Sequence, residues 1–211
     1  MFPLPQKCFS IIDASIFAAL SLLVSLAACT SLQEAGATSL KSKNDLIIFR
    51  GVCDGSAAVK LDDETILLAY DELNTVYSYA IAGGAPVASA DMGAMLNLKS
   101  ADEMDIEAAT VSGQQIWWIG SHSLDKKGAI APNRQMLFAT NIPSTNLSDL
   151  KLTTQPVDLS AVLMKSDKLT HVLTEAARKR HPKEGGFNIE GLAATANDGF
   201  LVGFSSPLNG L

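Results

Sequence analysis

Two short segments of the chain carry oxygen-bearing side chains in the same pattern. Residues 105–107 read Asp-Ile-Glu, and residues 188–190 read Asn-Ile-Glu. Carboxylate and amide oxygens are the ligands that a hard cation such as calcium prefers. We therefore predict that Asp105, Glu107, Asn188 and Glu190 form a metal or ligand site, with calcium as the candidate ion. In the alternative interpretation, each carboxylate caps backbone amides within its own repeat.

A second candidate site surrounds a single histidine. His122 lies in the sequence Gly-Ser-His-Ser, and Lys126, Lys127 and Arg134 follow it. Three cations can hold a phosphate through charge-assisted hydrogen bonds, and an imidazole can transfer a proton. This pattern predicts a catalytic role for His122 and a small anionic ligand on the three basic residues. The alternative is a solvated hairpin loop in which Arg134 pairs with a neighbouring acid; the adjacent serines lack the nucleophile-elbow pattern.

The N-terminal residues have the order of a bacterial lipoprotein signal. Lys7 supplies a positive charge, residues 14–28 are apolar except for three serines, and Leu-Ala-Ala precedes Cys29. The apolar run is shorter than the roughly 20 residues that a membrane-spanning helix needs. The pattern predicts cleavage of residues 1–28 and palmitate-type acylation of Cys29, which anchors the chain to a lipid membrane. The alternative is a buried apolar helix that ends in a cysteine.

The residues after Cys29 indicate where the protein resides. Thr30 resembles the outer-membrane sorting class, which favours the periplasmic side of the outer membrane if the host is Gram-negative. Residues 29–44 are small and polar and predict a flexible tether. We therefore expect a lipid-anchored protein of the bacterial cell envelope.

The elements that carry the candidate sites are predicted to be mainly strands. Short apolar runs rich in β-branched and aromatic residues alternate with turn residues, and Gly83-Gly84 is a typical hairpin turn. Residues 158–180 differ, since their apolar residues have helical spacing and cations follow at the end. We predict one helix there. The runs predicted as strands include 46–49, 65–70, 76–79 and 116–119.

An internal repeat predicts how the strands are arranged. Residues 105–120 resemble residues 188–203, and residues 54–69 form a weaker third copy. Each copy joins a strand of small residues to a bulkier strand across a polar turn. A unit of about 40 to 50 residues has the size of a β-propeller blade. In a propeller, the acidic residues at the start of the repeated strands would meet near one end of the central channel.

Composition excludes some partners. The net charge is −6 and the sequence has no long basic stripe, which argues against nucleic acid as a partner. The chain has three cysteines. Cys8 would leave with the signal and Cys29 would be acylated, so we expect no internal disulfide in the mature protein.

Several motifs between Gly51 and Leu208 resemble the DUF3616 family, a domain of unknown function related to the esterase-like phytase and β-propeller group. The resemblance implies an all-β, propeller-like domain over residues 45–211, with three to four blades and one inserted helix. Family members usually continue beyond the point where this sequence ends, which suggests a truncated copy. The motifs are residues 105–109, 118–123, 126–128, 132–134, 137–140, 188–192 and 203–204.

One departure affects a motif, because Ser205-Ser206-Pro207-Leu208 stands where similar proteins tend to have Arg-Asn-Pro-Leu. Together, the residues and the resemblance predict a membrane-tethered, propeller-like protein that binds a ligand or a cation. The alternative is a phytase-like hydrolase of phosphoesters or related esters. Kinship of fold alone does not establish an activity.

Overall fold

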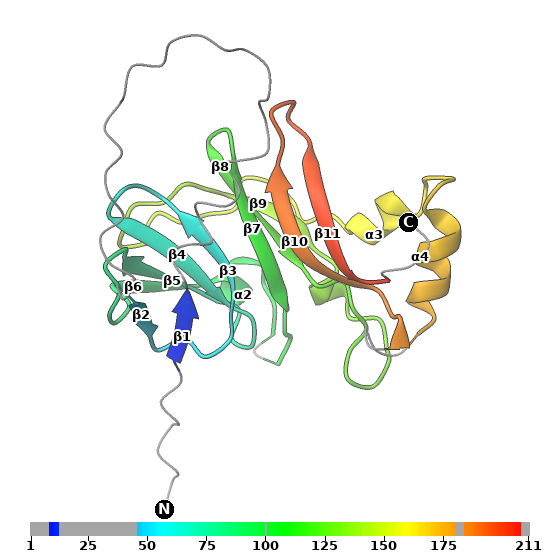
Figure 1. The fold of residues 1–211 in the computed structure, drawn as a ribbon, viewed down its shortest axis with the longest axis horizontal. Coiled ribbons are helices and arrows are strands. Elements are labelled where there is room, and N and C mark those ends of the chain that lie inside the picture. Colours follow the sequence, from blue (N-terminus) through cyan, green and yellow to red (C-terminus); the bar gives the residue numbers. More distant parts are fainter. Residues whose placement is uncertain (1–8, 13–45, 100, 180–183, 208–211) are drawn as a thin grey trace, which may run out of the picture.

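The computed structural model describes residues 9–12, 46–99, 101–179 and 184–207. They form several antiparallel sheets with a few short helices, which confirms the prediction of a mostly β protein (Figure 1). None of the helices in these ranges is long and apolar enough to cross a membrane.

The first sheet has four antiparallel strands in the order of the sequence. β4 lies inside it and is buried along nearly its whole length because both of its faces are covered. Leu67 and Ala69 pack into one apolar cluster, and Ile66 and Leu68 pack into another on the opposite face. The strands are β3 (Gly55–Lys60), β4 (Thr65–Tyr70), β5 (Thr75–Ala80) and β6 (Ala88–Asp91).

The second sheet has three strands, β7 (Ile106–Ser112), β8 (Gln115–Gly120) and β9 (Leu137–Asn141). Its two tryptophans point to opposite faces of β8. Trp118 is fully buried, and its indole Nε1 donates to Thr140 Oγ1 at 3.0 Å. Trp117 is only partly buried and contacts Phe200 of the third sheet.

The third sheet pairs β10 (Asn188–Ala194) with β11 (Phe200–Ser206). Two helices precede it, α3 (Leu159–Leu163) and α4 (Thr170–Ala177), so the prediction of one helix over 158–180 is wrong. The Thr170 hydroxyl donates to the carbonyls of Met164 and Ser166, at 2.6 and 2.7 Å. These bonds stabilise a turn between the two helices. A side-chain hydroxyl that bonds to backbone carbonyls competes with the hydrogen bonds of a continuous helix.

The helices cover one side of the third sheet (Figure 1). Leu173 and Ala176 of α4 pack with Phe187, Ile189 and Ile119, which joins α4 to both the second and the third sheet. Two shorter elements complete the described fold, α2 (Met92–Met95) and a 3-10 turn (Pro132–Arg134).

The first strands of the three sheets are neighbours, with β7 between β3 and β10 (Figure 1). Each has a register irregularity near its start, which leaves Ser56, Glu107 and Glu190 as bulge residues. These bulges confirm that the three repeated segments are structurally equivalent. The sheets of the described residues do not close into a ring.

The N-terminal part differs from expectation in one respect. Cys53 is disulfide-bonded, whereas the sequence predicted no internal disulfide for the mature protein. The other two cysteines, Cys8 and Cys29, lie outside the described residues. In the described chain β1 (Phe9–Ile12), within the predicted signal, pairs with β2 (Ile47–Arg50). Cleavage before Cys29 would therefore remove β1 and one candidate partner of Cys53.

Candidate functional site

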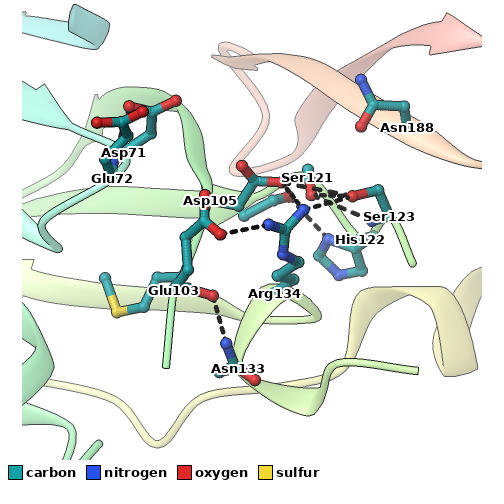
Figure 2. Close-up of polar contacts among 12 residues, drawn as sticks. Asp71, Glu72, Glu103, Asp105, Ser121, His122, Ser123, Asn133, Arg134 and Asn188 are labelled. Atoms are coloured by element: carbon teal, nitrogen blue, oxygen red, sulfur yellow. Dashed lines mark hydrogen bonds and ion pairs between the residues drawn. The ribbon is translucent and has the colours of Figure 1, made fainter. Parts of the chain in front are cut away.

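A network of charged side chains surrounds Arg134, which is buried (Figure 2). Its Nη2 lies 2.6 Å from Glu103 Oε2, and its Nη1 lies 2.8 Å from Asp105 Oδ2. Nη1 also donates to Ser123 Oγ at 3.1 Å. Arg134 thus joins two carboxylates, as the alternative interpretation of the basic loop expected.

Close backbone packing holds this group in place. Arg134 ends the 3-10 turn, and its carbonyl accepts a hydrogen bond from the backbone N–H of His122 at 3.0 Å. At Gly120, a Cβ atom would collide with the carbonyl oxygens of Arg134 and Met104. Only glycine permits that approach, so the Gly-Ser-His-Ser motif has a structural requirement at its first position.

His122 is buried at 3% exposure and bonds to two backbone groups. Nδ1 lies 2.8 Å from the carbonyl of Gly120, and Nε2 lies 3.3 Å from the amide nitrogen of Leu159. Because the Leu159 N–H needs an acceptor, this pair of contacts assigns the proton to Nδ1. Burial lowers the pKa of His122, which favours this neutral form.

The predicted phosphate loop is not assembled around the imidazole. Lys126 and Lys127 are exposed on a turn that the Asp125 carboxylate organises. Asp125 Oδ1 accepts from the backbone N–H groups of Lys127 and Ala129, both at 2.8 Å. His122 instead bonds to backbone and Arg134 to carboxylates, so the structure does not bring the four predicted residues to one ligand position.

The predicted acidic residues interact electrostatically, and two of them, Glu107 and Glu190, are hydrogen-bonded. Burial raises the pKa of Glu107 to about 8, and the charges of Asp105, Glu190 and Asp71 add to the effect. A hydrogen bond with Glu190 also favours the protonated form of Glu107. These four residues are called the acidic cluster below. They come from three sheets, since Asp71 follows β4, Glu107 is in β7 and Glu190 is in β10.

Asp71 extends the cluster toward the first sheet. Burial raises its pKa to about 6, and repulsion from Asp105, Asp54 and Glu72 contributes. The backbone N–H of Glu72 donates to Asp71 Oδ1 at 2.7 Å and partly offsets the shift. In Figure 2, Asp71 and Glu72 lie on one side of Asp105, and Asn188 lies on the other.

Asn188 supports the cluster through its amide group. Its Nδ2 donates to Glu190 Oε1 at 2.6 Å and to Ser205 Oγ at 2.9 Å. Within the described ranges, no three His, Cys, Asp or Glu side chains are grouped so that they could hold a metal ion. Calcium coordination by Asp105, Glu107, Asn188 and Glu190 therefore stays a prediction.

Two members of these networks were not predicted from the sequence. Glu103 is an Arg134 partner, and Asp71 is part of the acidic cluster. Their signal in the sequence is weak, because each is an ordinary acid in a polar turn. Cys29, the predicted lipidation site, lies outside the described residues.

A protein-family model matches part of the chain. Residues 55–141 match the family model described as "Protein of unknown function (DUF3616)", a span from the start of β3 to the end of β9. No curated protein matches the chain. The matched span contains the first two sheets and the Arg134 network, and the third sheet lies outside it. This match supports the predicted family over residues 55–141.

Proposed function

We propose that this protein is a membrane-tethered, propeller-like binding module whose ligand is a cation held at the acidic cluster. The observation that carries the proposal is that Glu107 of the second sheet is hydrogen-bonded to Glu190 of the third and is repelled by the charges of Asp105 and Asp71. Raised carboxyl pKa values in such a group are typical of functional sites, because charge repulsion is relieved when a cation binds.

The propeller-like architecture rests on the neighbouring first strands and their equivalent bulges. Successive propeller blades place their first strands around a central axis. The bulge residues Ser56, Glu107 and Glu190 would then surround one end of that axis. The Ser56 hydroxyl oxygen is buried and has no hydrogen-bond partner among the described residues.

The contacts of two residues favour binding over phosphoester hydrolysis. His122 bonds to backbone on both nitrogens, and Arg134 is neutralised by Glu103 and Asp105. A phosphate would have to compete with these carboxylates for the guanidinium group. Hydrolysis stays the alternative, and turnover of a phosphoester panel that both His122→Ala and Glu190→Ala abolish would favour it.

The cation proposal is tested by titrating the purified protein with calcium chloride and, separately, with spermidine. We expect at least one to bind, and to bind more tightly at pH 9 than at pH 6, because Glu107 must lose its proton. Glu107→Gln should weaken binding by about tenfold or more. The matched control is Asp63→Asn, which removes one exposed carboxylate that pairs only locally with Lys60.

The two probes distinguish a metal ion from an organic cation. The proposal is wrong if neither probe binds, or if Glu107→Gln changes the affinity no more than Asp63→Asn. A calcium response would support the predicted calcium site, whereas a response to spermidine alone would indicate recognition by charge without metal coordination.

Membrane tethering has its own test. Cells that express the full chain are labelled with an alkyne analogue of palmitate, and Cys29→Ser serves as the comparison. We expect label on the wild-type protein and none on the variant, because the Cys29 thiol accepts the lipid. Equal labelling of both would overturn the lipoprotein assignment.

A further inference from the structure

A hollow of about 730 Å³ lies between the hairpin turns of the second and third sheets. The acidic cluster is at the beginning of β7 and the hollow is at its end, so the strand separates them by about 20 Å. In Figure 1, the β7–β8 and β10–β11 turns lie together at the top of the view. The hollow is thus a separate place in the fold.

Two aromatic rings form part of its wall. The Trp117 and Phe200 ring centroids are 5.0 Å apart at an interplanar angle of 57°. Unlike Trp118 on the other face of β8, Trp117 retains solvent exposure. Both rings line the hollow, so it offers aromatic surface that the fold does not bury.

Polar side chains surround these rings. Gln115 Nε2 donates to Thr153 Oγ1 at 2.7 Å, which orients the amide. Gln114 and Asp198 are exposed at the rim, and neither side chain makes a hydrogen bond or ion pair within the described ranges. Amide, carboxylate and hydroxyl groups together can both donate and accept hydrogen bonds.

The lining chemistry favours a neutral, hydroxyl-rich ligand. Among the described residues that line the hollow there is no lysine, arginine or histidine to provide a counter-charge for an anion, and Asp198 is the single acid. A pyranose ring has an apolar C–H face that packs on an aromatic ring and an edge of hydroxyls that bond to amides and carboxylates. The volume lies within the usual range of about 300–1,000 Å³ for small-ligand pockets.

We propose that this hollow binds a sugar unit of a neutral oligosaccharide. Trp117 and Phe200 pack against the C–H face of the pyranose, and Gln114 and Asp198 bond to its hydroxyls. The inference stands apart from the cation proposal, because it uses different residues at the other end of the strands.

The test measures binding of cellotriose, maltotriose and tri-N-acetylchitotriose to the purified full chain by saturation-transfer NMR and tryptophan fluorescence. The chain has two tryptophans. Since Trp118 is buried, a fluorescence change on binding reports mainly on Trp117. We expect at least one of the trisaccharides to bind.

Variants then locate the binding site. Trp117→Ala should weaken binding by about tenfold or more, and Gln114→Ala by about threefold. Ile130→Ala is the matched control, because it truncates an exposed apolar side chain outside the hollow and should change the affinity less than about twofold. Glu107→Gln should leave sugar binding unchanged and so separates this site from the acidic cluster.

Two results would overturn the inference: absence of binding by all three trisaccharides, or binding that Trp117→Ala and Gln114→Ala both leave intact. If Trp117→Ala does not fold, Gln114→Ala and Asp198→Asn, at exposed turn positions, decide the question.

Discussion

Arg134 shows how one buried cation stabilises two acids of another loop. Glu103 and Asp105 precede β7, whereas Arg134 precedes β9. The ion pairs therefore join the segments that lead into the first and the last strand of the second sheet. Removing one partner of a buried ion pair is costly because the remaining charge is left without compensation. The network therefore has a structural role even where the sequence suggested ligand binding.

We expect Arg134→Met to lower the free energy of unfolding by about 3 kcal/mol, because two carboxylates then lose their shared partner. Urea denaturation followed by circular dichroism measures the change. Lys126→Met is the control, since Lys126 is exposed on a turn. Equal effects of the two substitutions would contradict the assigned role of Arg134.

The acidic cluster predicts an unusual pH dependence of stability. The folded protein keeps a proton on Glu107 up to a pKa of about 8, whereas the unfolded chain releases it near the ordinary value of 4.5. The unfolded state therefore binds fewer protons between these values, and the free energy of unfolding falls as the pH rises from about 5 to 8. Asp71, with a pKa of about 6, adds to the fall at the acidic end of that range.

Glu107→Gln should flatten this pH profile, because glutamine carries no charge at either end of it. Each unit of pKa difference corresponds to about 1.4 kcal/mol, so the variant should gain stability relative to wild type as the pH rises. Thermal unfolding at several pH values measures the gain. Asp63→Asn should keep the wild-type slope, and a Glu107→Gln profile parallel to wild type would refute the prediction.

At the scale of elements, His122 connects the second sheet to α3. Its Nε2 accepts the N–H of Leu159, the first residue of that helix, while the Asp158 carboxylate accepts the N–H of Ala161 at 3.1 Å. The start of α3 therefore depends on Asp158 of its own segment and on His122, which follows the end of β8. A five-residue helix has little stability alone, so these contacts are needed to hold it.

His122→Ala should expose residues 159–163 to faster amide hydrogen exchange and cost about 1–3 kcal/mol, because buried backbone groups lose their partners. His171→Ala, on the exposed side of α4, is the control. Unchanged exchange of α3 in His122→Ala, together with loss of a measured phosphoesterase activity, would instead indicate a catalytic histidine.

At the scale of the whole molecule, the third sheet has the fewest strands of the three sheets that contain the repeated segments. It has two strands, while the first and second sheets have four and three. β11 forms its edge, and Leu201 there is 66% exposed. Unpaired backbone groups of an edge strand promote pairing with another chain.

We therefore expect concentration-dependent self-association, which light scattering coupled to gel filtration measures. Leu201→Lys should shift the protein toward the monomer, because a lysine on an edge strand opposes pairing. Leu73→Lys is the control, because Leu73 is exposed in the turn between β4 and β5 of the first sheet. Self-association that Leu201→Lys and Leu73→Lys change equally would show that β11 is not the interface.

The sequence by itself determined the strands, the repeat and the family, because these depend on local alternation and on motifs that recur along the chain. It also identified Asp105, Glu107 and Glu190 as a group, since they occupy equivalent repeat positions. It could not separate α3 from α4, because their apolar spacing continues across the turn that Thr170 stabilises. Nor could it show that Cys53 is disulfide-bonded.

Only the tertiary structure decided the roles of the charged residues. Arg134 looked available for phosphate until the fold placed Glu103 and Asp105 beside it, and His122 looked reactive until burial and backbone contacts engaged both nitrogens. Asp71 joined the acidic cluster through packing of the first sheet against the second. The physical reason is that charge interactions depend on distance and burial, which neighbouring strands set and sequence separation does not.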